Sequence, residues 1–427
     1  MAATNSTSPI RAFPWIAIAV AAGAAAAVVP HLTSRDARGA AEAQAQRVGA
    51  QTTIVAAPTN ADGLRRRIGE MEERLRARPA DASAAVPLAD ALLRQARATT
   101  DPRPAGRAEA VLKAVLRETP AEYDALRMLG AIYLSEHRFR EALDVARRAR
   151  DLRPTDAWNY GVIGDALVEL GDYDKAFEAF DTMASMRPSA TAYARVAYGR
   201  ELRGDMSGAV EAMQIAEQST AAQDVEARAW YAAQLGELHL RSGNFDAATR
   251  EYRRAAFLFP NYPHAMVGLG KVKVASGDRD GALDLFLAQL KRTPTLDIAA
   301  RIGDLYAERG DRIESERYYQ LAEDLAGPPA AQTEANLALF LAERGRKLPQ
   351  AITIAEAVAA DRADIFTEDA LAWTYYQAGR LTEAAAASQR ALRTGTRDER
   401  ILSHAAQIAA VAQKGSKAGG RKAGIHG

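Results

Sequence analysis

Two stretches of the chain share one pattern: GDALVELGDYDKAFEAFDTMASMRP at residues 164–188 and GKVKVASGDRDGALDLFLAQLKRTP at residues 270–294. In both stretches a glycine stands first, a Gly-Asp pair follows seven residues later, and a proline stands last. Self-similarity of this kind at a fixed spacing is typical of repeat architectures, in which one small structural unit is copied along the chain. The rest of the chain therefore has to be searched for the same period.

Two residue types share one period of about 34 residues along the chain. Prolines that close a helix recur at Pro154, Pro188, Pro260, Pro294 and Pro328. Glycines recur at Gly171, Gly204, Gly243, Gly277, Gly310, Gly345 and Gly379. Because glycine adopts the left-handed conformation found at helix C-termini, each of these glycines is predicted to end one helix of a pair. An Asp or Asn often follows and is expected to cap the next helix.

Small and bulky residues alternate around each predicted turn. Ala176 lies five residues after Gly171, and Phe180 follows one helical turn later on the same face. Gly164 lies seven residues before Gly171 and gives the first helix a notch of its own. We therefore expect the two helices of each unit to approach closely, with the bulky side chain filling the notch.

These residues resemble the tetratricopeptide repeat (TPR) family, whose 34-residue unit has an aliphatic-glycine pair, an aromatic residue, two alanines and a closing proline. The unit at residues 122–156 shows the pattern most fully, with Leu129, Gly130, Tyr133, Ala142, Ala149 and Pro154. Its departure is His137 at the turn-glycine position, which predicts a mildly strained turn. The resemblance implies helix-turn-helix repeats stacked into a right-handed superhelical solenoid.

The resulting fold class is all-α, with about nine TPR units in the array at residues 81–398. The predicted units are residues 81–122, 123–156, 157–189, 190–228, 229–262, 263–295, 296–329, 330–364 and 365–398. A unit of this kind cannot bury its apolar face alone, so neighbouring units must stack. We expect capping helices at residues 61–80 and 399–413 and a disordered basic tail at residues 414–427.

The N-terminal segment at residues 1–32 reads as a signal peptide or a membrane anchor. An uncharged run extends from Phe13 to Val29 and is short for a membrane span. Small residues do not stand at a good cleavage position, which favours an uncleaved hydrophobic helix over a cleaved signal peptide. Residues 33–60 lack large apolar periodicity and are predicted to be a linker. The segment indicates a cell-envelope location, membrane-anchored or, after cleavage, periplasmic or secreted.

Composition excludes several classes of function. The 55 Lys and Arg residues nearly cancel the 54 Asp and Glu residues, so there is no overall field to attract nucleic acid. The chain has no cysteine, which removes disulfides, thiolate metal ligands and cysteine nucleophiles. We therefore predict no nucleic-acid partner.

No motif predicts catalysis or a bound cofactor. The six histidines show no metal-ligand spacing, and the calcium-loop-like string SGDRDG at residues 276–281 lacks the carboxylate that such a loop needs at Leu287. Phosphate-binding and nucleophile motifs are absent as well. We expect no metal, no cofactor, no small-molecule substrate and no enzymatic activity.

The resemblance implies that the first helix of each repeat lines a concave groove that holds an extended peptide or a helix. The candidate partner-binding residues follow the notch position or lie near it: Asp165, Arg195, Tyr198, Gln234, Glu237, Lys271, Arg301, Asp304, Asn336 and Trp373. Trp373 is expected to be accessible to a partner. The alternative is that these side chains are merely solvated and that a partner binds the rim or the insertions.

The sequence thus predicts a non-enzymatic scaffold or adaptor of the cell envelope that binds a protein or peptide through its concave surface. A second hypothesis is a structural accessory subunit of an envelope biogenesis or export complex. Membrane attachment through residues 13–29 is expected if that segment is not cleaved.

Overall fold

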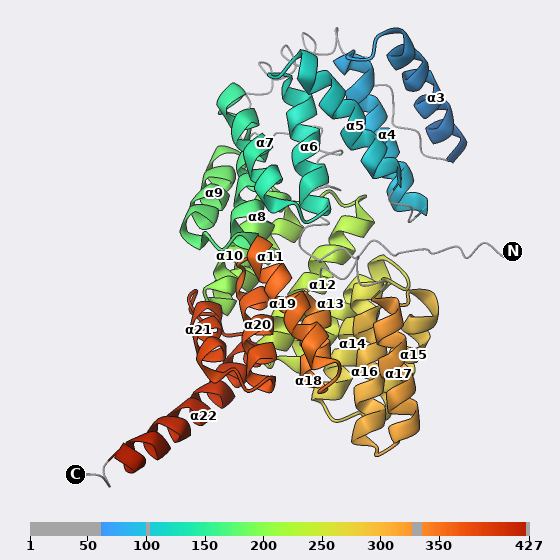
Figure 1. Cartoon of the computed structure of the whole chain (residues 1–427). Coiled ribbons are helices and arrows are strands. Elements are labelled where there is room, and N and C mark those ends of the chain that lie inside the picture. The colour runs from blue at the N-terminus through green and yellow to red at the C-terminus, as the bar shows by residue number, and fades with distance from the viewer. Residues whose placement is uncertain (1–60, 100–102, 327–334, 424–427) are drawn as a thin grey trace, which may run out of the picture. The chain divides into compact units, whose positions relative to one another are not determined.

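The computed structural model describes residues 61–99, 103–326 and 335–423, which are helical throughout apart from short turns and contain no strand. The predicted all-helical fold is confirmed for these residues (Figure 1). The predicted hydrophobic segment at residues 13–29 and the linker at residues 33–60 lie outside them. None of the described helices has the length and hydrophobicity of a membrane span.

Helices α4 to α21 form nine helix-turn-helix pairs, as the period predicts. Their bounds are α4 Ala82–Thr99 and α5 Arg103–Glu118; α6 Tyr123–Ser135 and α7 Phe139–Leu152; α8 Ala157–Glu169 and α9 Tyr173–Met186; α10 Ala190–Leu202 and α11 Met206–Gln218; α12 Val225–Arg241 and α13 Phe245–Leu258; α14 Pro263–Ala275 and α15 Arg279–Arg292; α16 Leu296–Glu308 and α17 Arg312–Leu325; α18 Ala335–Glu343 and α19 Leu348–Asp361; α20 Ile365–Gln377 and α21 Leu381–Ala391.

Two further helices flank the pairs. The predicted N-terminal cap is α3 (Ala61–Ala77), which packs on α4. At the other end α22 (Glu399–Ala423) packs on α20 and α21. This helix does not stop at residue 413, so the prediction of a disordered tail is wrong for residues 414–423. The alanines at its start, residues 405, 406, 409 and 410, are strong helix formers, and the glycines and lysines that follow do not end the helix.

The chain divides into two compact units, with the boundary after Arg153. The described part of the first unit contains α3 to α7, and the second unit contains α8 to α22. The boundary falls between the second and the third helix pair of the array predicted for residues 81–398. Seven of the nine pairs, α8 to α21, lie in the second unit, and the candidate groove residues all lie there too.

The periodic glycines end helices as predicted. All seven have a positive φ, between 62° at Gly345 and 83° at Gly277. At Gly171 the backbone N–H of the glycine donates to Val168 and that of Asp172 donates to Leu167, which satisfies carbonyls at the end of α8. His137 takes the same position in the second pair with a φ of 62°, so the predicted strain is present.

The polar residues after these glycines cap the next helix less uniformly than predicted. The carboxylates of Asp205, Asp278 and Asp311 accept the backbone N–H three residues later. Asp172 makes no such bond, because its carboxylate accepts from the Lys175 ammonium at 2.6 Å instead. Asn244 also forms no side-chain cap. The expectation of a side-chain cap was therefore wrong at these two positions.

Close helix approach at the notches is confirmed. A Cβ on Gly164 would lie well under 3 Å from the ring of Phe180, and a Cβ on Gly270 would lie equally close to the ring of Phe286. Both rings are almost completely buried. Only glycine leaves room for the ring at this crossing, so the notch and the bulky residue fix how the two helices of a pair meet.

Candidate interaction surface of the second unit

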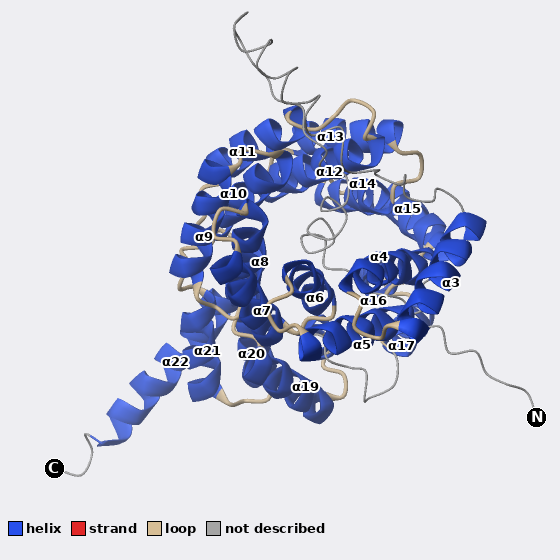
Figure 2. Cartoon of the chain, turned by 90° about the horizontal axis from the view of Figure 1, so that it is seen from above, coloured by secondary structure: helices blue, strands red, loops and turns tan. Residues whose placement is uncertain are grey.

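The first helices of the pairs lie on the inner side of the second unit. Within this unit α12 packs on α14 and α18 packs on α20, whereas no two second helices of the described residues pack as closely. A stack whose first helices are closer together than its second helices must curve towards the first helices. Figure 2 shows this order, with α8, α12 and α14 inside α9, α13 and α15. The candidate residues all lie on first helices.

Asp165 and Arg195 join the first helices α8 and α10. The Arg195 guanidinium donates from Nη2 to Asp165 Oδ2 at 2.6 Å and from Nε to Oδ1 at 2.9 Å. The two side chains are only 14% and 11% exposed. Removing one partner of such a two-bonded pair would leave the other charge buried, so this pair holds neighbouring repeats together.

Glu237 is the centre of a second cluster. Its carboxylate accepts from Lys271 Nζ on α14 at 3.1 Å, from Arg241 Nε at 3.3 Å and from the Tyr252 hydroxyl at 2.8 Å. Burial opposes ionisation of this carboxyl, but Lys271 and Arg241 outweigh it and hold the pKa of Glu237 far below its usual range. Glu237 is therefore a charged anchor between repeats.

The next link lies between α16 and the residue after α18. Arg344 donates to both oxygens of Asp304, at 2.9 Å from Nε and 2.5 Å from Nη2. The Tyr319 hydroxyl donates to the same carboxylate at 2.9 Å. Three of the predicted acidic residues, Asp165, Glu237 and Asp304, are thus each satisfied by a neighbouring repeat.

The open part of the predicted surface lies on α16 and α18. Arg301 is 37% exposed, and its guanidinium donates to Asp297 one turn earlier on the same helix, at 2.9 Å. Asn336 on α18 is exposed. These two side chains present a cation and an amide on the inner side without serving as a link between repeats.

The remaining candidates on α10 and α12 are largely enclosed. Gln234 is buried, and Tyr198 is half-buried. Burial raises the pKa of Tyr198 well above its ordinary value, so the phenol stays neutral. Neither side chain stands free for a partner in the way that Arg301 and Asn336 do.

The expectation that Trp373 is accessible is wrong. Its side chain on α20 is only 7% exposed, because its ring stacks on the imidazole of His404 with ring centroids 3.9 Å apart. His404 lies on α22, and its Nδ1 lies 3.0 Å from Asp369 Oδ1. Trp373 therefore packs against the terminal helix α22 and joins it to the last repeat. The repeat pattern could not show this, because α22 lies outside the repeats.

One junction of the second unit was not predicted at all. Segments 362–365 and 392–398, which flank α20 and α21, contact the C-terminal ends of α8, α10 and α12. We name these two segments the clasp. Figure 1 shows α20 and α21 beside α8 and α10, although more than 150 residues separate them in sequence. The consecutive helix pairs and the clasp together form a closed circuit of packed elements.

The clasp contacts α8 through a buried group of charges. The Arg362 guanidinium donates to Glu169 Oε2 at 2.7 Å and lies 3.4 Å from Asp364 Oδ2. The hydroxyl of Tyr173 accepts the backbone N–H of Ile365 at 2.8 Å. Burial, opposed by Arg362 and reinforced by Asp364 and the nearby Asp165, raises the pKa of Glu169 to about 8.

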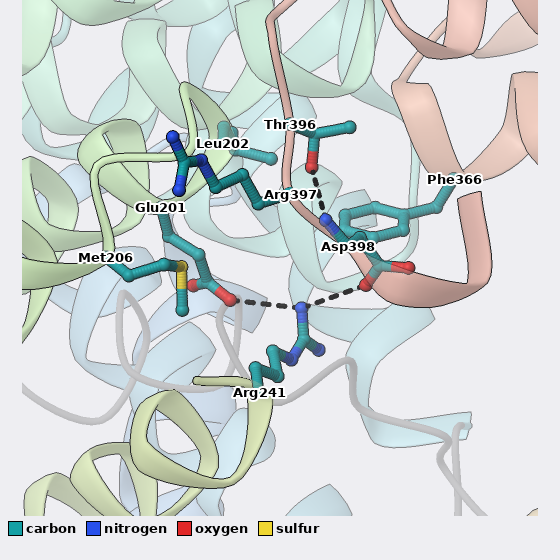
Figure 3. A pocket seen from close by; sticks show the side chains of 8 residues that line it. All are labelled: Glu201, Leu202, Met206, Arg241, Phe366, Thr396, Arg397 and Asp398. Carbon is teal, nitrogen blue, oxygen red and sulfur yellow. Dashed lines mark hydrogen bonds and ion pairs between the residues drawn. The ribbon is translucent and has the colours of Figure 1, made fainter. Parts of the chain in front are cut away.

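The clasp reaches α10 and α12 through Arg241. Its guanidinium lies between Glu201 Oε1 at 3.0 Å and Asp398 Oδ2 at 3.3 Å (Figure 3). A small pocket opens beside this bridge, and Phe366 and Met206 form part of its apolar lining. No group of acidic or histidine side chains in the described residues has the arrangement of a metal site.

A family model described as Tetratricopeptide repeat matches residues 105–157, 162–224 and 233–297. These stretches are therefore tetratricopeptide repeats, as the resemblance implied. Among curated proteins no sequence matches this chain.

Two solved structures of human IFIT1 show the same fold. The human IFIT1 dimer with m7Gppp-AAAA is 16% identical, with a TM-score of 0.52 over 77% of this chain and 76% of that chain. The human IFIT1 dimer with PPP-AAAA is also 16% identical, with a TM-score of 0.50 over 77% of both chains. A chain of the APC/C hetero-tetramer Cut9–Hcn1 is 17% identical, with a TM-score of 0.44, and this chain spans 59% of its length. At these identities the likeness concerns the fold.

Proposed function

We propose that this chain, which carries tetratricopeptide repeats, is a non-enzymatic scaffold that holds a protein or peptide partner on the first-helix side of its second unit. Proteins with these repeats generally act as scaffolds for protein–protein interaction. The observation that carries the proposal is that some of the candidate residues on the first helices link neighbouring repeats, whereas others do not. Asp165, Glu237 and Asp304 are occupied in linking repeats, whereas Arg301 and Asn336 remain open.

This division supports capture of an extended segment. The links hold the first helices in a fixed register, so a partner meets a preformed surface and its binding does not require the repeats to be ordered first. Arg301 offers donors in a planar fork that suit a carboxylate or a backbone carbonyl, and the Asn336 amide both donates and accepts. An extended peptide with acidic and polar side chains matches this surface.

We further propose that the scaffold works at the cell envelope, held there by the uncharged run at residues 13–29. The support is the hydrophobicity of that run and its lack of charged residues. Fractionation of the full chain, followed by N-terminal sequencing of the mature protein, tests both the location and the cleavage. Recovery of an intact chain in the soluble fraction would contradict the anchor.

Site-specific crosslinking tests the partner surface. A photoreactive amino acid in place of Asn336 should give discrete protein adducts in membranes. Arg301→Ala should reduce their yield, because it removes the exposed cation on the first helix of the preceding pair without breaking an ion pair between repeats. The matched control is Arg317→Ala on α17, which likewise removes an arginine paired with an acidic residue of its own helix, Glu314.

The outcomes of this experiment separate the alternatives. Adducts that depend on Arg301 but not on Arg317 support a partner on the inner side. Adducts that form equally with a photoreactive residue in place of Gln320, on the second helix α17, would refute it. Stoichiometric copurification with one membrane complex would identify the chain as an accessory subunit of that complex, in place of an adaptor for many partners.

A further inference from the structure

The backbone of the clasp packs against two of the seven periodic turn glycines, Gly171 and Gly204. We call these two positions the seats of the clasp. A Cβ on Gly171 would lie 2.6 Å from the carbonyl oxygen of Ala363, and a Cβ on Gly204 would lie 2.7 Å from that of Gly395. At Gly243 and Gly277 no neighbouring atom lies within 4 Å of the same point, and this also holds for Gly310, Gly345 and Gly379. The close approach is therefore a property of the clasp and not of the repeat.

Arginines of the clasp lie at the ends of the two helices that these glycines terminate. The Arg393 guanidinium lies over the ring of Tyr173, 5.0 Å from its centroid, and donates to the carbonyl of Ala363. Arg397 lies beside Gly204. Cations at helix C-termini are favoured, because the exposed carbonyls there carry partial negative charge. The clasp and its seats are thus complementary in both shape and charge.

The clasp nevertheless differs from the contacts between successive repeats. Successive pairs bury interlocking alanines and aromatic rings, as the buried ring of Tyr252 on α13 does against Gly268 on α14 of the next pair. The clasp rests mainly on polar contacts: the Arg362–Glu169 pair, the Arg241 bridge and backbone bonds such as Ala363 N–H to Glu169 O at 2.9 Å. Such pairs gain little net stability once their desolvation is included. A polar junction of this kind opens at lower cost than a repeat interface.

We propose that the clasp is a reversible gate, which opens while the helix pairs stay folded and admits an extended protein segment to the first-helix side of the second unit. This inference rests on the function proposed above. When the clasp is closed, the pairs from α8 to α21 form a closed circuit, so a segment with bulky ends reaches the inner side only after the clasp has opened. The gate then sets the rate of capture, and the surface around Arg301 and Asn336 holds the segment.

Distance measurement tests the opening directly. The chain has no cysteine, so spin labels can be placed on Lys175→Cys and Ser403→Cys alone. Both positions are exposed, one on α9 beside the seat and the other on α22 beyond the clasp. Gly171→Ala with Gly204→Ala should shift the interspin distances to longer and broader values. Gly277→Ala with Gly310→Ala is the matched control, because it imposes the same backbone strain at the ends of helices that the clasp does not contact.

Two results would overturn the gate at this stage. If neither pair of substitutions changes the interspin distances, then the clasp does not depend on its seats. If both pairs change them equally, or if helical circular dichroism falls only in the Gly171 and Gly204 variant, then the contact is part of the folded core. Longer distances with unchanged helicity in that variant alone support a separable clasp.

Capture kinetics test the consequence. With the photoreactive residue at position 336, the Gly171 and Gly204 variant should form its adducts several-fold faster than the Gly277 and Gly310 variant. Equal rates would refute the gate and leave the scaffold function standing. Absence of adducts in every variant would refute the scaffold function and with it the gate's role in capture, while the distance measurement would still decide whether the clasp opens.

Discussion

Gly270→Ala tests whether the ring of Phe286 is held in the notch at Gly270. Two effects of this substitution change the free energy of unfolding in opposite directions. In the interior of a helix, replacing glycine by alanine stabilises by about 1 kcal/mol. Here the new Cβ would lie well under 3 Å from the buried ring of Phe286. Overpacking of this kind costs about 1–3 kcal/mol. The substitution should therefore leave the protein unchanged or destabilise it by up to about 2 kcal/mol.

Urea denaturation followed by circular dichroism measures this balance. Gly69→Ala in α3 serves as the control for propensity alone, because no atom lies within 4 Å of its Cβ position. In a Phe286→Ala background the obstacle is gone, and Gly270→Ala should then stabilise by about 1 kcal/mol. The cycle should give a coupling of about 1–3 kcal/mol. If Gly270→Ala stabilised the native chain as much as Gly69→Ala does, then the ring would not be held in the notch.

Three further substitutions probe charge and burial. Burial raises the pKa of Glu169 from 4.5 to about 8 in spite of Arg362, so the folded state favours the neutral form of this carboxyl. The resulting stability is full below pH 4.5 and is lost as the pH rises through about 8, so Glu169→Gln should flatten that part of a plot of melting temperature against pH. For Glu237 stability depends on pH in the opposite direction, because its lowered pKa gives stability above pH 4.5 that is lost on acidification. The melting temperature of Glu237→Gln should therefore fall less than that of the native chain between pH 5 and pH 2. Phe257→Ser should change the free energy of unfolding by less than about 0.5 kcal/mol in urea titrations, because this side chain is 86% exposed.

The helix pairs were predictable from the sequence because every signal that defines them is local. Gly171 ends α8, and Pro188 follows the end of α9 at Met186 by two residues. Each of these effects acts within a turn or two of the residue that causes it, and repetition of the unit turns weak local preferences into a strong pattern. The partners of the notch residues follow from the same period.

The sequence shows less well which of the candidate residues are open to a partner, although all of them do lie on first helices. The column of residues contains Asp165 and Glu237, but the sequence does not say that Arg195 and Lys271 of the next repeats satisfy them. Pairing between side chains 30 or 34 residues apart depends on rotamers and on the stacking of repeats. The period shows which residues share a face and leaves open which of them remain available to a partner.

The clasp lay beyond prediction for a different physical reason. Arg362 and Glu169 are 193 residues apart, and the clasp residues stand in linkers where the repeat imposes no residue type. Gly171 shows the consequence most clearly. Its place in the period and its φ of 78° are explained by the turn alone, just as at Gly243 with a φ of 72°.

Gly171 differs from Gly243 because the clasp packs against it. The absence of a side chain at Gly171 leaves room for the carbonyl of Ala363. At Gly243 a substitution would therefore cost backbone strain alone. At Gly171, which has the same position in the repeat, the new side chain would also collide with the clasp. Asp165 shows the same for a charged residue, since this predicted partner-binding residue is paired with Arg195 of the next helix pair. In this chain a periodic residue has a special role where a second segment contacts it, and Gly171 and Gly204 are the turn glycines at which that contact is made.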